Sequence, residues 1–299
     1  MSNGRAQGAL TLATWLLAAG CASTDPRPAF EGAARLAAER GVSGARVLSD
    51  DVTRREAAER VHALLAAPLT ADSAAEIALL GNPNLQADLA GLGIAQADLA
   101  QAALLANPRL SIVDLHAEGR APGSQRTVSL EVAILDWLVQ PLRKRVAAAE
   151  LERVRLMAGG AILETAAAAR SAFVSYQAAE QLIGRLEIIE RLDQAGADFA
   201  ESLFQAGNLG ALPRAQARAT WAETHAALEE ARAGSRRARE AVNVALGLSG
   251  EDDWTAPAEL PELPAPGDEA DLTAVEALAA RQRLDLSAAR FAVDAIGRA

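Results

Sequence analysis

The sequence predicts a mainly α-helical protein with one long antiparallel helical hairpin and a two-stranded β-hairpin before it. First, hydrophobic residues make up 51% of the chain but aromatic residues only 3%, which suits closely packed helices better than a large β-sandwich. Second, residues 143–205 contain no proline and keep a helical period of apolar side chains. Third, residues 127–134 alternate between apolar and polar side chains, as a strand with one apolar face does.

Residues 1–20 have the features of a secretory signal peptide. Their apolar run at 9–19 is too short to span a hydrocarbon core of ~30 Å, which needs about 20 residues. Small residues then precede Cys21, the only cysteine, in a string that resembles a bacterial lipoprotein signal. We expect Cys21 to be acylated, for example with palmitate, as the mature N-terminus; the alternative is an ordinary signal peptide in which Cys21 is incidental. Residues 21–50 are expected to form a lipid-anchored tether with at most a short helix around 30–40.

Two helices are expected before the strands. The first covers 51–66, DVTRREAAERVHALLA, and opens with an aspartate cap. The second covers about 72–105 and is expected to break at Gly81-Asn82-Pro83, because proline lacks the backbone donor and restricts the residue before it. Asn107-Pro108 ends this second helix.

A β-hairpin is expected at about 109–136. Residues 109–118 give a weaker strand pattern than 127–134, and turn residues lie between the two. One face of the second strand carries four apolar side chains, those of Val128, Leu130, Val132 and Ile134. A strand of a membrane β-barrel needs one apolar and one polar face, so we expect these four side chains to face lipid. A hairpin on a soluble core is the alternative, but it needs a partner surface that this helical chain does not obviously provide.

The long helical hairpin is expected to occupy residues 143–248. Its first helix continues to about 205, and its second runs from Arg214 to about Leu248 with apolar and small residues spaced three and four apart. In the turn between them, Gly207 is suited to terminate the first helix, and Pro213 is suited to the first turn of the second.

The chain after residue 248 is expected to contain a linker and the beginning of a second repeat. Residues 249–270 combine four prolines with many acidic residues, which predicts an extended solvated linker. Residues 274–299 then echo residues 74–99 at an offset of about 201, so residues 271–299 are expected to begin a second copy of the 51–248 repeat.

Composition excludes several functions. The net charge of -10 argues against a nucleic-acid-binding scaffold, which would carry a basic stripe. The three histidines, His62, His116 and His225, lie far from one another and from Cys21 without any short ligand spacing, so no metal or other cofactor is expected. No cluster of polar residues predicts an enzyme, and no catalytic residue is assigned.

Several strings, in this order along the chain, together resemble the outer membrane factor, or TolC-like, family of efflux ducts. They are Ile77-Ala78-Leu79-Leu80-Gly81-Asn82-Pro83-Asn84-Leu85, Asn107-Pro108-Arg109-Leu110-Ser111, Leu138-Val139-Gln140-Pro141-Leu142-Arg143-Lys144-Arg145, Phe204-Gln205-Ala206-Gly207-Asn208-Leu209-Gly210-Ala211-Leu212 and Leu246-Gly247-Leu248. The resemblance covers about 51–299. It implies that the helical hairpin is a segment of a periplasmic α-barrel and that the β-hairpin contributes to an outer-membrane β-barrel.

The resemblance also implies the partners and the place of action. Such ducts are homotrimers in the outer membrane that extend into the periplasm and conduct small molecules or ions passively. An inner-membrane pump drives the transport through a periplasmic adaptor, whose binding site at the hairpin tip maps to Gly207, Asn208, Leu209 and Gly210. Ala22, directly after Cys21, fits an outer-membrane destination for a lipoprotein. Pro213 departs from the polar or acidic residue that many members have there.

Family members have two repeats, so we expect the 299 residues to be an incomplete duct, truncated after the first repeat. Two strands per subunit would give a trimer too few strands for a solute-sized barrel. Two other functions are weighed against the duct: a periplasmic adaptor, which would flank its helical hairpin with glycine-rich β segments, and a structural coiled-coil lipoprotein, in which the strand at 127–134 would have no role. The resemblance also implies that the pump, and not the duct, selects the transported substrate.

Overall fold

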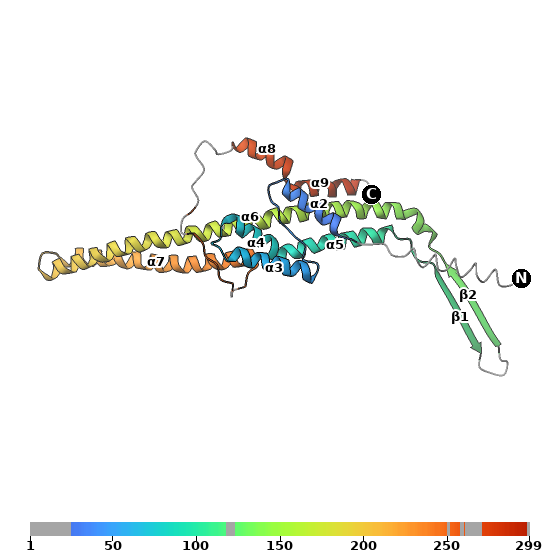
Figure 1. Ribbon diagram of the computed structural model, residues 1–299, viewed down its shortest axis with the longest axis horizontal. Helices are drawn as coiled ribbons and strands as arrows, with labels where there is room; N and C mark the ends of the chain where they lie inside the picture. Colours follow the sequence, from blue (N-terminus) through green and yellow to red (C-terminus); the bar gives the residue numbers. More distant parts are fainter. Residues whose placement is uncertain (1–24, 118–122, 250–251, 258–259, 261–270, 298–299) are drawn as a thin grey trace. The chain divides into compact units, whose positions relative to one another are not determined.

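The computed structural model describes residues 25–117, 123–249, 252–257, 260 and 271–297. It confirms a mainly α-helical fold with one antiparallel β-hairpin (Figure 1). In chain order the elements are α2 (Arg27–Ala38), α3 (Asp51–Leu65), α4 (Ala71–Gly81), α5 (Pro83–Ala103), β1 (Arg109–Ala117), β2 (Gly123–Glu131), α6 (Ile134–Gln205), α7 (Ala211–Leu246), α8 (Leu272–Gln282) and α9 (Leu284–Gly297).

Contacts divide the chain into two compact units. Unit 1 comprises Met1–Gly32, Ala90–Met157 and Asp285–Ala299, and contains the β-hairpin and the start of α6. Unit 2 comprises Ala33–Leu89 and Ala158–Leu284, and contains the helical hairpin of α6 and α7.

The core of unit 2 forms where α4 packs against α6 and α7. Ile77 of α4 and Phe173 of α6 are almost completely buried, together with Val242 and Leu246 of α7. Gly81 and Gly247 permit a close approach of α4 and α7, since a Cβ added to Gly247 would lie 2.7 Å from the carbonyl oxygen of Gly81. Gly247 also has a φ of 73°, a left-handed conformation that ends α7 and favours glycine. Small residues at these two helix ends therefore position α4 against α7.

The break between α4 and α5 is built by Asn82. Its backbone is extended, its side-chain oxygen accepts from the N–H groups of Asn84 and Leu85, and its amide donates to the carbonyl of Ala245 at 2.9 Å. Pro83 follows and starts α5, where its missing N–H costs nothing. The predicted break at 81–83 thus occurs, with α4 ending at Gly81 and α5 at Ala103.

The expected solvated linker does not begin at residue 249. Trp254 is only 2% exposed, its ring N–H donates to Asn243 at 2.8 Å, and the Arg239 guanidinium lies 4.1 Å from its ring centroid. The N–H of Leu69 donates to the carbonyl of Thr255 at 2.8 Å. Residues 252–257 form a strap across the core of unit 2, because the aromatic side chain outweighs the acidic residues around it. Residues 261–270 lie outside the described part of the chain.

The tether expected at 21–50 is packed where the structure describes it. Alanines spaced four apart give α2 a close-packing stripe, and Ala33 and Ala37 are fully buried in unit 2. The side chain of Gln86 accepts from the N–H of Leu48 and donates to the carbonyl of Arg46. The short helix expected around 30–40 is therefore a packed element at 27–38.

Candidate functional site

The β-hairpin in unit 1 has two faces of different composition, set by its register. Leu110 lies opposite Leu130 and Ile112 opposite Val128, all on one face, and each is at least 60% exposed. The neighbouring face at this end carries Ser111 and Ser129, whose hydroxyl oxygens lie 2.6 Å apart. This end of the hairpin therefore has one apolar and one polar face, as expected for Val128 and Leu130.

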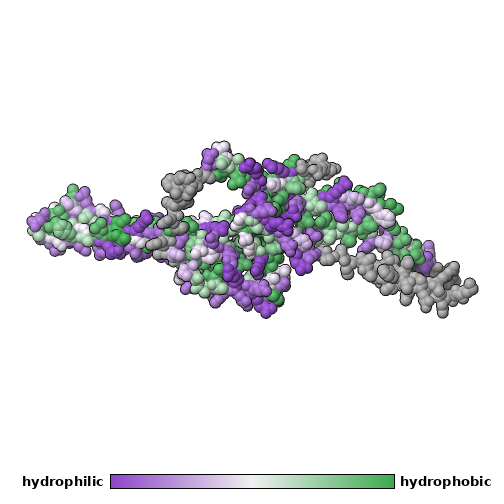
Figure 2. All heavy atoms as spheres, turned by 45° about the horizontal axis from the view of Figure 1, so that its top comes forward, coloured by the Kyte–Doolittle hydropathy of each residue, from purple (hydrophilic) through white to green (hydrophobic). Residues whose placement is uncertain are grey.

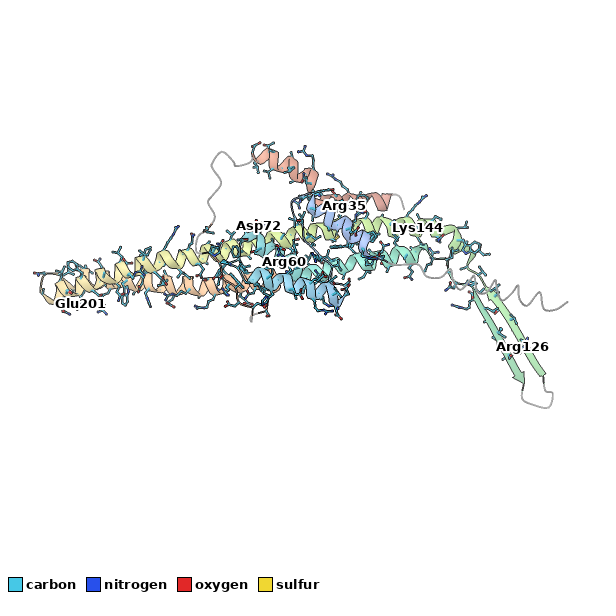
Figure 3. The ribbon with its side chains drawn as sticks, viewed as in Figure 1. Arg35, Arg60, Asp72, Arg126, Lys144 and Glu201 are labelled. Atoms are coloured by element: carbon cyan, nitrogen blue, oxygen red, sulfur yellow. The ribbon has the colours of Figure 1, made fainter. Side chains whose placement is uncertain are left out.

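Towards the loop of the hairpin the polarity of the two faces changes. Arg126 and Asp114 lie on the same face as Val128 and form an ion pair at 2.7 Å, which raises the pKa of the Arg126 guanidinium above its ordinary value. Arg126 is labelled on β2 in Figure 3. Val113, which is 47% exposed, lies on the opposite face. The apolar face thus ends at the Arg126–Asp114 pair.

The strand ends earlier than predicted. Val132 lies between β2 and α6, and Ile134 is the first residue of α6, so neither belongs to the strand face expected for them. The last pair of the ladder joins Arg109 to Glu131. The residue before Arg109 is Pro108, which has no N–H to continue the ladder, so alternation in the sequence beyond Glu131 has no partner strand.

Both strands of the hairpin have a free edge within the described residues, because the sheet contains only β1 and β2. Each is nine residues long, and the described side chains along it are exposed, apart from the half-buried Ser111. An isolated two-stranded hairpin is marginally stable in water, and unpaired edges readily bind further strands. The hairpin is therefore a surface suited to strand pairing.

The tip of unit 2 is the turn between α6 and α7. The N–H of Asn208 donates to the carbonyl of Leu203 and the N–H of Gly207 to that of Phe204, a Schellman arrangement with Gly207 at a φ of 74°. Gly207, Asn208 and Gly210 are exposed, whereas Leu209 is half-buried. The four residues predicted for the tip are thus brought together in one turn.

Beside the turn lies a charged and aromatic contact that sequence reasoning missed. The Arg214 guanidinium lies 3.9 Å from the ring centroid of Phe204, and its Nη1 atom lies 3.8 Å from Glu201. Arg214 Nε and Glu201 Oε2 are buried and have no hydrogen-bond partner among the described residues. Figure 3 labels Glu201 at this end of α6. The only available signal was that an aromatic and a basic residue flank a predicted turn.

Polar contacts join residues 180–193 of α6 to residues 221–235 of α7, and these were also missed. Trp221 donates to Glu190 at 3.1 Å, Thr224 donates to Asp193 at 2.6 Å, and Arg232 pairs with Glu187 at 2.9 Å. Ser235 also donates to Glu180. Figure 2 shows hydrophilic and hydrophobic residues mixed on the surface of this hairpin. The hairpin is therefore held by side-chain pairs as well as by an apolar stripe.

The other residues considered in the sequence analysis do not form a further functional site among the described residues. Cys21 and residues 1–20 lie outside the described residues. Within the described part, no three His, Asp or Glu side chains group as a metal site would require. A hollow beside the 41–44 loop is lined by Asp72 and Arg170, which pair with each other at 3.0 Å. No helix among the described residues combines the length and the apolar character that crossing a membrane requires.

Solved structures share this fold. A membrane protein from Pseudomonas aeruginosa matches with a TM-score of 0.60 at 18% identity, over 79% of this chain and 55% of its own. The outer membrane protein VceC from Vibrio cholerae matches with a TM-score of 0.57 at 18% identity, over 75% and 56%. The CmeC outer membrane channel of Campylobacter jejuni matches with a TM-score of 0.57 at 15% identity, over 69% and 45%.

The chain spans about half the length of these structures. No protein-family model matches the sequence. No curated protein matches it either. The likeness therefore lies in the fold: the chain has the fold of outer membrane channels, with a long helical hairpin and an antiparallel β-hairpin.

Proposed function

We propose that this chain is the outer-membrane channel component of a tripartite efflux or secretion system, through which small molecules or ions pass without a catalytic step. The observation that carries the proposal is the exposed two-stranded hairpin with free edges, in a fold shared with outer membrane channels. A soluble protein would leave the apolar side chains of Leu110, Ile112, Val128 and Leu130 in water, whereas a shared barrel pairs the edges and turns these residues to lipid.

In this proposal the hairpin is one of the two that each subunit contributes, as the family resemblance implies, because two strands per subunit would be too few for a solute-sized barrel in a trimer. Strand edges of neighbouring subunits pair and close the barrel, and the assembly is a homotrimer. The backbone of α8 and α9 supports a second repeat: α4 starts at Ala71 and α8 at Leu272, 201 residues later, and the breaks at Asn82 and Arg283 have similar dihedral angles, with φ of -69° and -65°. The acylated Cys21 adds an anchor in the outer membrane.

The tip of the helical hairpin is the proposed docking site for a periplasmic adaptor, which couples the duct to an inner-membrane pump. Gly207, Asn208 and Gly210 are exposed and two of them lack side chains, so a partner backbone can approach closely. Leu212, 70% exposed in the first turn of α7, adds an apolar contact.

Membrane fractionation with a matched pair of variants tests the barrel. Because the proposed Cys21 anchor alone would hold the protein in the outer-membrane fraction, the variants are compared by the amount of trimer recovered from that fraction. Val128→Asp places a charge on the apolar face and is expected to lose most of this trimer, since a charge facing lipid costs up to a few kcal/mol per strand position. Ser129→Asp, on the polar face of the same strand, is expected to keep it. Equal behaviour of the two variants, or wild-type protein in the inner-membrane fraction as for an adaptor, would contradict the proposal.

Pump-dependent export tests the tip. Gly210 has a φ of -75°, so Gly210→Tyr introduces bulk without backbone strain, and we expect export to fall at least tenfold with an unchanged protein level. Ala219→Tyr, at an exposed position on α7 away from the turn, is the control and should export normally. Normal export by Gly210→Tyr would place adaptor docking elsewhere.

A further inference from the structure

The start of α6 in unit 1 carries apolar surface that the described residues do not cover. Leu135 and Leu138 are 77% and 75% exposed, and Trp137 is 54% exposed. The amide of Gln140 donates to the carbonyl of Ala103 at 2.6 Å, which fixes the end of α5 beside this segment. We use the name collar for the exposed apolar side chains here, namely Leu104, Leu105, Leu135, Trp137, Leu138 and Leu142.

A basic run follows the collar directly. Arg143, Lys144 and Arg145 are consecutive and exposed, in a chain whose net charge is -10 and whose only lysine is Lys144. Arg143 pairs with Asp136 at 2.9 Å, but Lys144 and Arg145 have no acidic partner among the described residues. Lys144 is labelled on α6 in Figure 3. Two positive charges therefore remain free to bind an anion.

The order of the two features along α6 matches the layers of a bilayer surface. At 1.5 Å per residue, residues 134–142 cover roughly 13 Å before the charges begin, so a helix that enters the bilayer along its own axis places this apolar part deeper than the charges. Tryptophan is enriched at membrane interfaces because its ring is apolar and its N–H is polar. The adjoining end of the β-hairpin, at Glu131, carries the apolar face with Leu130 and Val128.

We propose that the collar and the basic run form an interfacial surface that inserts into the headgroup layer of a bilayer with anionic phospholipids. The collar lies in the acyl boundary, and Lys144 and Arg145 bind lipid phosphates. This surface rests on the proposed function, in which the hairpin next to it enters the membrane. A partner helix would fit less well, because Trp137, Leu138 and Val139 are consecutive exposed residues and so cover more of the circumference than one packing stripe.

Vesicle flotation of the full chain tests the charges. Vesicles of phosphatidylethanolamine with phosphatidylglycerol are compared with vesicles of phosphatidylcholine, so that binding through the hairpin or through acylated Cys21 cancels in the ratio. The double variant Lys144→Glu/Arg145→Glu is expected to lower the preference for anionic vesicles at least 25-fold, since each basic residue near such a surface contributes roughly fivefold. High salt should lower the wild-type preference in the same direction.

The control makes the same change of charge elsewhere. Arg236 and Arg237 are consecutive exposed residues on α7, and Arg236→Glu/Arg237→Glu should keep the preference within about twofold. If both double variants lost the preference for anionic vesicles equally, the preference would depend only on the net charge of the protein, and the proposal would be overturned. A change in subunit number for the collar variants with unchanged lipid preference would assign the surface to a contact between copies, and would also overturn it.

Quenching by brominated lipids tests the collar. Lipids brominated near the headgroup should quench the tryptophan fluorescence of the wild-type protein, because Trp137 is placed at that depth. This quenching should fall strongly in Trp137→Phe, whereas Trp221→Phe should keep most of it. Leu138→Gln should weaken binding several-fold more than Leu192→Gln, a change at a position of similar exposure, 71%, further along α6. Unaltered quenching in Trp137→Phe would overturn insertion. Membrane fractionation of cells tests the channel separately, so failure of either proposal is recognised independently.

Discussion

The helix pairs α4–α5 and α8–α9 have the same local backbone and very different surroundings. Both are broken by one extended residue, Asn82 or Arg283, whose N–H donates to the carbonyl four residues earlier. Yet Ile77 is fully buried, whereas Leu278, at the corresponding position of α8, is 48% exposed. Similar sequences can therefore set the same helix break, while burial depends on whether other helices cover the apolar face.

The two pairs also differ in how their ends are capped. Thr70 and Ser73 form a reciprocal capping box at the start of α4, whereas Asp271 makes no side-chain cap bond at the start of α8. Gly81 ends α4 against Gly247, but the corresponding residue of α8 is Gln282. The α4–α5 pair thus has a capping box and a small residue at a helix end that favour close packing, and each of these features can be removed by a separate substitution.

The largest difference is expected for the buried and exposed apolar residues. Ile77→Ala should lower the free energy of unfolding of unit 2 by about 2–5 kcal/mol, because it leaves a cavity between α4, α6 and α7. Leu278→Ala should cost less than about 1 kcal/mol, since its side chain is already half in water. Urea unfolding in mild detergent, followed by circular dichroism, measures both. Equal costs would show that α8 is covered in solution as α4 is.

The next largest effect concerns the close approach of α4 and α7. Gly247→Ala should cost about 2–4 kcal/mol, from the left-handed backbone and from the contact with the carbonyl of Gly81. Gly207→Ala provides the control, because it has the same sign of φ but open space around its Cβ, and should cost only about 1 kcal/mol. The same unfolding experiment applies, and a Gly247 variant no less stable than the Gly207 variant would disprove a tight contact.

The side chain of Asn82 is expected to contribute less. Asn82→Ala removes its bonds to Ala245, Asn84 and Leu85, and should cost about 1–3 kcal/mol because buried backbone groups lose their partner. Asn84→Ala removes an exposed side chain two residues later and should change stability by less than about 0.5 kcal/mol. Hydrogen exchange of the Leu85 amide provides a local measurement, and unchanged protection in Asn82→Ala would refute the assigned bond.

The smallest effect is expected at the helix starts. Thr70→Ala should destabilise the protein by about 1 kcal/mol through loss of the capping box, while Asp271→Ala should be nearly neutral. Thermal unfolding of the two variants distinguishes them. A larger decrease in melting temperature for Asp271→Ala than for Thr70→Ala would mean that the Asp271 side chain caps α8 in solution.

Sequence periodicity predicted the long helices and the break at Asn82 because these depend on local rules. It placed the start of this helix at residue 143, where the proline-free stretch begins, whereas α6 begins at Ile134 and contains Pro141. Trp254 was missed because its neighbours are acidic residues and prolines, and only the fold brings Asn243 and Arg239 to its ring. At the tip, the turn residues were predictable, but the contact between Arg214 and Phe204 depends on how α7 leaves the turn.

The strap at Trp254 has a consequence for the order in which the chain can fold. The apolar face of α4 is completed by Phe173, Leu246 and Trp254, which lie far along the chain from Ile77. Contacts between such distant segments form slowly, because the loop between them must close first. During synthesis, the apolar face of α4 therefore stays exposed until the strap at Trp254 has been made. A chaperone that shields this face would have to stay bound to α3 and α4 during that time.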